Sequence, residues 1–292
     1  MIHYSYPLYR PPAEADNLII QATYGCSYNE CSFCSMYKTK SYKVRALEDV
    51  YKEIDTLSLA YPAAHKIFLA DGDALSLPME HLILLLQYLQ KSFPNIKRVS
   101  AYASAQNLLA RSKEELQLLY EHKLNLIYFG IETGSNLILK KITKGVSQSN
   151  IIEALNRASS AGIKISATVI LGIGGNKYSV EHIQESAEVI NATTLNYLST
   201  LQLGLEEGAK DNFYKYFSDF TPLGDSQIIA EQKSFIEMLN PKNKIIFRSN
   251  HASNAFHLSG TLPKDKARLI QELEFAMGVG ESALVPVRYR GF

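Results

Sequence analysis

The sequence predicts an α/β fold, in which a partial (βα)6 TIM-like barrel is followed by a C-terminal α+β extension. Short apolar runs alternate with segments of helical period, a rhythm typical of parallel sheets covered by helices. Six such units fit into about the first 210 residues, as a six-stranded partial barrel requires. We therefore expect a barrel with an N-terminal lead-in over residues 1–209, and an extension packed on it over residues 210–292.

Each predicted strand is an apolar run that ends at glycine or polar residues, and each predicted helix repeats apolar residues at helical spacing. The predicted strands span residues 17–25, 66–70, 98–104, 124–134, 163–172 and 195–203. The predicted helices span residues 44–60, 78–92, 149–161 and 179–192. Ser112 begins a further helix, because Glu115 three residues later completes a capping-box pattern. In the extension we expect helices over 227–238 and 264–277 and a short strand over 244–247.

Composition narrows the class of protein. The chain has 292 residues, of which 46% are hydrophobic, enough for one large core. Its 30 basic and 29 acidic residues nearly balance, which argues against a nucleic-acid partner. The N-terminus lacks a signal-peptide pattern, and the longest apolar run, near residues 82–89, is too short to cross a bilayer. We therefore expect a cytoplasmic protein with no membrane partner.

All three cysteines, Cys26, Cys31 and Cys34, lie close together after the first predicted strand. An odd, clustered set is a poor disulfide framework and a good metal site, and strand ends of this kind form the catalytic face of a barrel. Three thiolates would leave one iron of a 4Fe–4S cluster open to a chelating small molecule. The alternative is a zinc-binding barrel module without redox chemistry, in which His3 or His65 supplies a fourth ligand.

The cysteine segment, Gly-Cys-Ser-Tyr-Asn-Glu-Cys-Ser-Phe-Cys-Ser-Met-Tyr over residues 25–37, resembles the cluster loop of the radical S-adenosylmethionine (SAM) superfamily. The commonest spacing in that family is Cys-x3-Cys-x2-Cys, and this chain has one more residue in the first gap, as some subgroups do. Phe33 stands where the family places an aromatic residue against the adenine of SAM. The resemblance implies that the three cysteines hold a 4Fe–4S cluster and that SAM is a cofactor.

Further similarities fall at the ends of later predicted strands. The Asp-Gly-Asp turn after the second strand resembles the family's Gly-Gly-Glu-like turn, which receives the amino group of SAM. The Gly-Ile-Glu segment ending the fourth strand is similar to that of the subgroup containing oxygen-independent coproporphyrinogen oxidase and the methylthiotransferases. The Gly-Ile-Gly-Gly segment ending the fifth strand resembles an adenine-contacting turn. The cofactor-binding residues that the resemblance implies are Phe33, Asp71, Gly72, Asp73, Glu132, Gly172 and Gly174.

The resemblance also implies a reaction. The cluster, reduced by flavodoxin or ferredoxin, cleaves SAM to a 5′-deoxyadenosyl radical, which abstracts hydrogen from an unidentified small or medium organic substrate in oxidoreductase, lyase or transferase chemistry. The catalytic candidates are Tyr102, as a hydrogen donor, and His251, as an acid or base. Arg248 and Asn250, in the polar segment after the strand predicted over 244–247, are substrate-binding candidates. A radical enzyme acting on tRNA or a peptide is a further alternative, against which the neutral charge counts.

Overall fold

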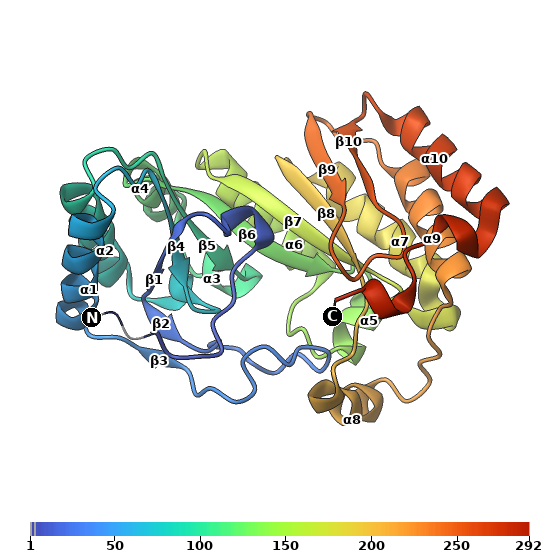
Figure 1. Cartoon of the computed structure of the whole chain (residues 1–292), viewed down its shortest axis with the longest axis horizontal. Helices are drawn as coiled ribbons and strands as arrows, with labels where there is room; N and C mark the ends of the chain where they lie inside the picture. Colours follow the sequence, from blue (N-terminus) through green and yellow to red (C-terminus); the bar gives the residue numbers. More distant parts are fainter. Residues whose placement is uncertain (1, 3, 292) are drawn as a thin grey trace. The chain divides into compact units, whose positions relative to one another are not determined.

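The computed structural model describes residues 2 and 4–291 and divides the chain into two compact units (Figure 1). The first unit consists of Met1–Asn29, Met36–Phe129 and Arg157–Ile165, and the second of Glu30–Ser35, Gly130–Asn156 and Ser166–Phe292. Both contain parallel strands connected by helices. The predicted α/β class with a mostly parallel sheet, consistent with a partial barrel, is confirmed.

The strands of the first unit pair in chain order, and every pair is parallel. These strands are β1 (Leu18–Gln21), β4 (Lys66–Ala70), β5 (Arg98–Ala103) and the part of β6 (Leu124–Glu132) that ends at Phe129. A short antiparallel ribbon follows β1, formed by β2 (Thr23–Tyr24) and β3 (Lys43–Val44). The helices are α1 (Leu47–Ala60), α2 (Met79–Ser92), α3 (Ala105–Leu109) and α4 (Lys113–Glu121). Parallel pairing in chain order needs a crossover after each strand, and these helices supply it.

The capping box and the helical periodicity of the first unit form helices as predicted. The hydroxyl of Ser112 accepts a hydrogen bond from the amide of Glu115, whose side chain caps in return, so the predicted capping box starts α4. Helix α1 buries Val50, Ile54 and Leu57, which lie on one helical face. α1 and α2 lie side by side in Figure 1.

In the second unit the strands again pair in chain order, and the last strand runs antiparallel. These strands are β7 (Lys164–Leu171), β8 (Tyr197–Gln202), β9 (Ile245–Ser249) and β10 (Leu258–Leu262). The helices are α5 (Asn136–Lys141), α6 (Gln148–Ser160), α7 (Gly175–Ala192), α8 (Glu207–Tyr216), α9 (Asp225–Met238) and α10 (Lys266–Val279). The residues after 209 therefore add a strand in parallel register with β8, and the predicted domain boundary stays a prediction.

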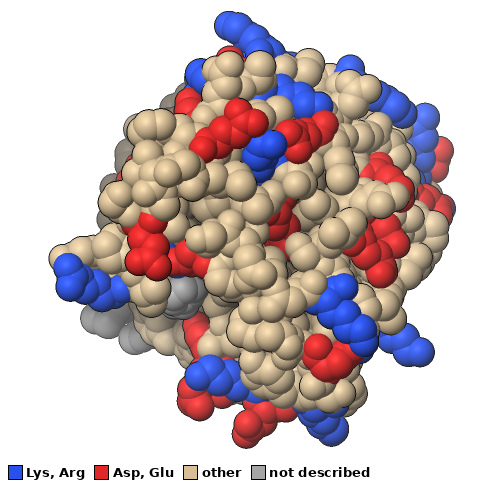
Figure 2. Space-filling model, turned by 90° about the vertical axis from the view of Figure 1, so that its right-hand side faces the viewer, with Lys and Arg blue, Asp and Glu red and all other residues tan. Residues whose placement is uncertain are grey.

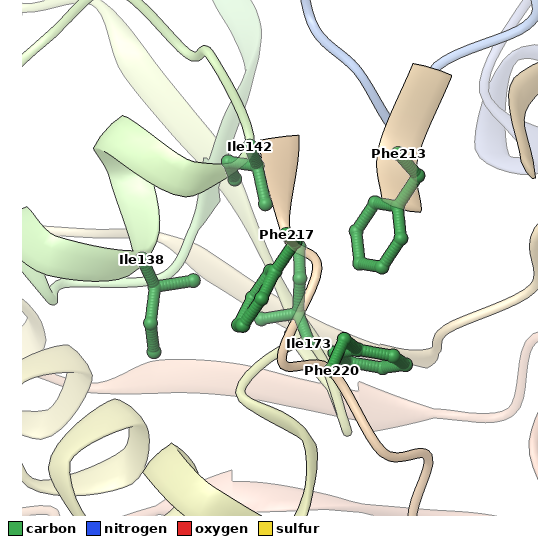
Figure 3. Close-up of a cluster of buried hydrophobic side chains, with 6 residues drawn as sticks. All are labelled: Ile138, Ile142, Ile173, Phe213, Phe217 and Phe220. Carbon is green, nitrogen blue, oxygen red and sulfur yellow. The ribbon is translucent and has the colours of Figure 1, made fainter. Parts of the chain in front are cut away.

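Three helices, α3, α5 and α8, and two strands, β3 and β10, are absent from the sequence prediction, and α1 begins at Leu47 because Val44, predicted as helical, pairs in β3. α8 comes from the aromatic-rich segment after residue 209, whose side chains fill a buried cluster (Figure 3). The members of this cluster are Ile138, Ile142, Ile173, Phe213, Phe217 and Phe220. The aromatic residues of that segment therefore pack against α5 and the turn after β7.

Across the described part of the chain, no helix combines the length and the apolar character that a membrane span requires.

Candidate functional site

The second and third cysteines lie in a tight turn of the second unit. The amide of Cys34 donates to the carbonyl of Cys31 across 3.4 Å. The amide of Ser32 donates to the carbonyl of Ile142 at 3.0 Å, and the hydroxyl of Thr143 donates to the backbone just before Cys31 at 2.6 Å. Hydrogen bonds on both sides thus attach the turn to the segment that follows α5.

The basic side chain of Lys144 comes from that same segment. Its Nζ donates to Oε1 of Glu132 at 2.7 Å and lies 5.9 Å from the centre of the Phe33 ring. Burial lowers the pKa of Lys144, but negative charge at Glu132, Cys31 and Cys34 opposes this more strongly, and the pKa lies above its ordinary value. Lys144 is therefore a cation close to two of the predicted cluster ligands, and the sequence analysis did not identify it.

Glu132 ends β6 in an unusual backbone conformation. Its φ is +62°, a region that residues other than glycine seldom adopt. Its carboxylate folds back over Gly130, where any side chain would overlap it. Only 8% of Glu132 is exposed. The pairing that a buried carboxylate requires comes from Lys144 of the same chain, and a contact of Glu132 with SAM stays a prediction.

Phe33 is partly buried and packs against the buried cluster of the second unit. The aromatic ring in the cysteine turn therefore has a packing role in the folded chain, and its contact with adenine stays a prediction.

In the first unit, Asp73 contacts the residue that follows the first cysteine. Ser27, which follows Cys26, donates its hydroxyl to Oδ2 of Asp73. The other oxygen, Oδ1, is buried and has no hydrogen-bond partner. Burial raises the pKa of Asp73, although the Ser27 hydrogen bond acts in the opposite direction. A buried carboxylate oxygen without a partner is a place where a cationic ligand group would be stabilised.

The other two residues of this turn are engaged within the chain. Asp71 is fully buried, pairs with Lys40 at 2.5 Å and accepts from the amide of Gly25 at 3.3 Å. At Gly72 a side chain would overlap the ring of Tyr37. Asp71 and Gly72 thus hold the loop between β2 and β3 in place. Their contacts with SAM stay predictions.

The turn after β7 contains Gly172 and Gly174. The amide of Gly172 donates at 2.5 Å to Oε1 of Glu231, a residue of α9 that the sequence analysis did not identify. The hydroxyl of Ser179 donates to the second carboxylate oxygen. At Gly174 a Cβ would lie 2.8 Å from the carbonyl oxygen of Tyr178, closer than real Cβ atoms approach. Both glycines are therefore enclosed by neighbouring backbone or side chains.

Tyr102 lies in β5, as predicted, within an aromatic group. Its ring centre is 5.2 Å from that of Phe68 and 6.3 Å from that of Tyr128, both in edge contacts. Tyr128 in turn donates its hydroxyl to the buried carboxylate of Glu14 at 2.6 Å. This packing provides a structural role for Tyr102, and its role as a hydrogen donor stays a prediction.

The C-terminal candidates lie at the end of β9. Arg248 belongs to the strand itself, because β9 continues to Ser249 and does not end at Phe247 as the sequence predicts. Arg248 and Asn250 are both exposed, whereas His251 is half-buried and its ring lies 2.9 Å from the hydroxyl of Ser253. Burial lowers the pKa of His251. The structure thus brings these three residues to one strand end, two of them open to solvent.

The three cysteines are the predicted metal ligands. The three cysteines form no disulfide, and each is partly exposed. Within residues 2 and 4–291, no three His, Cys, Asp or Glu side chains are gathered as a ready metal site, so the complete ligand set stays a prediction. A set of thiols accompanied by a lysine has the chemistry that suits an iron–sulfur cluster.

The zinc-binding alternative requires a histidine, His3 or His65, as the fourth ligand. His3 lies outside the described residues. His65 precedes β4, whereas Cys26 follows β1 and β2. Because β1 and β4 are parallel, His65 lies at the edge of that pair opposite to the end from which the cysteine loop leaves. The structure therefore offers no support for His65 as a partner of Cys26.

Comparisons with known proteins identify the family. Residues 20–190, more than half of the chain, match the family model of the Radical SAM superfamily. A tRNA-2-methylthio-N(6)-dimethylallyladenosine synthase from Petrotoga mobilis is 25% identical over 232 residues, which cover 75% of this chain and 50% of that protein. The chain spans half or less of the length of the first curated relatives it matches.

Two solved structures share the fold. Coproporphyrinogen III oxidase (HemN) from Escherichia coli aligns with a TM-score of 0.57 at 15% identity, over 76% of this chain and 52% of that one. Methylornithine synthase (PylB) aligns with a TM-score of 0.54 at 18% identity, over 78% and 63%. Members of the matching superfamily use a 4Fe–4S cluster and SAM. The cysteine loop, the parallel α/β fold and the extent of the family match together establish that this chain belongs to the radical SAM superfamily.

Proposed function

We propose that the chain is a radical SAM enzyme in which Cys26, Cys31 and Cys34 hold one 4Fe–4S cluster. When bound, the cluster and SAM supply one-electron cleavage of the sulfonium C–S bond, which yields methionine and a 5′-deoxyadenosyl radical that takes a hydrogen atom from a substrate C–H bond. Flavodoxin or ferredoxin supplies the electron, the substrate is a small or medium organic molecule, and the protein acts in the cytoplasm.

The observation that carries this proposal is the cysteine turn fixed beside Lys144. Two hydrogen bonds hold the backbone of the turn on the segment after α5, which supports a role for Cys31 and Cys34 as ligands from one fixed turn. A positive charge near a thiol favours the thiolate, which is the form that binds iron. Lys144 therefore supplies a positive charge beside both proposed ligands.

Asp73 is the residue we assign to the amino group of SAM. Its buried Oδ1 lacks a partner in the folded chain, and its Oδ2 is fixed by Ser27, next to Cys26. A carboxylate prepared in this way would accept an ammonium group without reorganisation. Arg248, Asn250 and His251 remain our candidates for contact with the substrate, since Arg248 and Asn250 are exposed.

The proposal is tested by reconstituting the protein anaerobically with iron and sulfide. We expect about four irons and four sulfides per chain, broad iron–sulfur absorption, and formation of 5′-deoxyadenosine when SAM and dithionite are added. Cys31→Ala and Cys34→Ala should abolish both signals, whereas Ser35→Ala, a matched change in the same loop, should retain them. A cluster that leaves SAM intact under dithionite contradicts the proposal, and a bound zinc without iron or sulfide supports the zinc-binding alternative.

A further inference from the structure

The turn after β7 is held by a helix that lies outside the family match. The match ends at residue 190, and α9 begins at Asp225. α9 packs against α7, the helix that starts immediately after this turn. The resemblance assigns the turn to the adenosine part of SAM, so a partner that fixes its shape would act on cofactor binding.

Glu231 makes the decisive contacts from α9. Its Oε1 accepts from the amide of Gly172 at 2.5 Å, and its Oε2 accepts from the hydroxyl of Ser179 in α7. Only 4% of Glu231 is exposed. In its ionised form the carboxylate of Glu231 only accepts hydrogen bonds, so both partners then present a hydrogen to it. One buried side chain therefore sets the direction of the Gly172 amide and of the Ser179 hydroxyl.

Close contacts leave no room for side chains at two glycines of the turn. Gly172 has a φ of +80°, and a Cβ there would lie 2.6 Å from Cδ1 of Ile228 in α9. Gly175 has a φ of +57°, and a Cβ there would lie 2.7 Å from the carbonyl oxygen of Thr221. That carbonyl accepts from the amide of Asn176 at 2.8 Å. Residues 221–231 thus enclose the turn, and its backbone cannot move without disturbing them.

Burying a carboxylate against neutral donors has an energetic cost. Burial raises the pKa of Glu231 to about 7, although both hydrogen bonds act to lower it. A glutamine would fill the same volume without that cost. Compared with a glutamine, the carboxylate accepts a stronger hydrogen bond from the Gly172 amide.

We infer that Glu231 is a positioning residue for SAM: it fixes the backbone from Gly172 to Gly174 in the shape that receives the adenosine part, and α9 thereby belongs to the cofactor site. The inference rests on the proposed function, because it requires that SAM bind at this turn. It goes beyond that function by assigning a role to a segment outside the matched residues.

The test compares Glu231→Ala with Glu231→Gln in the reconstituted full chain. Alanine removes both hydrogen bonds, whereas glutamine can accept from Gly172 and donate to Ser179. We expect Glu231→Ala to weaken SAM binding by about tenfold, with unchanged iron and sulfide content and a higher KM for SAM but little change in kcat. Glu231→Gln should restore most of the affinity. Glu237→Ala, an exposed change on the same helix, should bind SAM as the native protein does.

A second measurement does not depend on SAM or on the alanine variant folding well. Ser179→Ala removes one of the two hydrogen bonds at a partly exposed position. Hydrogen exchange of the amides in residues 170–176 should become at least about tenfold faster in Ser179→Ala and faster still in Glu231→Ala. In Glu231→Gln it should stay close to the native rate.

The outcomes separate the two claims. Native affinity for SAM in Glu231→Ala, or native exchange in both Glu231→Ala and Ser179→Ala, overturns the positioning role and leaves the proposed function intact. A glutamine variant as weak in SAM binding as the alanine variant also overturns it, because charge and not hydrogen-bond direction would then be responsible. A native protein that carries its cluster and binds no SAM overturns both claims.

Discussion

Among single residues, Lys144 joins two parts of the candidate site. It pairs with Glu132 at the end of β6 and lies close to the cysteine turn, over the ring of Phe33. The sequence does not identify Lys144 as a site residue. Most lysines are exposed, and nothing in the neighbouring sequence distinguishes Lys144 from them. Its importance comes from the hydrogen bonds that bring the distant cysteine turn to its neighbours, Ile142 and Thr143.

We predict that Lys144→Met will hold its cluster less firmly. Without the ammonium group, the cysteine turn loses a neighbouring positive charge and Glu132 loses its partner, so cluster affinity should fall about tenfold. Iron remaining after a chelator challenge measures this loss. Lys144→Arg should retain most of the iron, and Lys141→Met, which removes a lysine paired with exposed Asp219, serves as the control. Equal iron retention in Lys144→Met and Lys141→Met would show that the charge has no such effect.

At the level of elements, the turns that follow β6 and β7 fit closely against α7. The amide of Gly134 donates to the hydroxyl of Ser186 at 2.8 Å, and any side chain at Gly134 would overlap the carbonyl of Glu185. The turn after β7 is closed in a similar way by Glu231 from α9. Both turns follow the carboxyl ends of strands, where the sequence analysis expected the cofactor residues.

Gly134→Ala should destabilise the protein by about 3 kcal/mol, because backbone in α7 must move to admit the methyl group. Urea unfolding measures this difference. Gly208→Ala provides the matched comparison, since nothing lies within 4 Å of a Cβ at that position and an alanine in the first turn of α8 suits the helix. Equal free energies of unfolding for the two variants would contradict the close fit described here.

The pKa of Glu231 also predicts how stability depends on pH. The folded value, about 7, lies above the unfolded value of 4.5, so the folded state binds the proton more tightly. The resulting stabilisation is complete below pH 4.5 and is lost as pH rises through 7. Glu231→Gln does not titrate, so its free energy of unfolding should improve relative to the native protein by on the order of 3 kcal/mol between pH 5 and pH 8. A difference between the two proteins that is the same at both pH values would contradict the raised pKa.

For the whole molecule, the balance of basic and acidic residues argues against tight binding to nucleic acid. The chain has a formal net charge of +1, and Figure 2 shows basic and acidic side chains interspersed over the face it displays. Tight binding to a polyanion requires many basic contacts and weakens steeply with salt.

We therefore predict that tRNA binds weakly, with a Kd above about 10⁻⁵ M in 0.15 M salt, close to non-specific affinity. Filter binding at several salt concentrations measures this. Tight, salt-sensitive binding would instead favour the alternative of a radical enzyme that acts on tRNA.

The sequence by itself determined the fold class, the order of the strands and helices and the cysteine loop that marks the family. These features are local: strand and helix periods, the capping box at Ser112 and the spacing of three cysteines lie within short windows of the chain. Even so, the sequence does not predict β3, β10 or three helices, because their patterns are short and packing orders their residues, as in the aromatic cluster that includes α8.

Only the tertiary structure decided how the site residues are paired. Asp71 and Asp73 look alike in the sequence, and each keeps one buried oxygen without a hydrogen-bond partner, yet Asp71 forms an ion pair with Lys40 whereas Asp73 accepts from the neutral hydroxyl of Ser27. The sequence does not identify Glu231 as a site residue, because its contact with Gly172 joins positions far apart in the chain. A carboxylate's role depends on which donors and cations surround it once folded, and residues distant in sequence supply them.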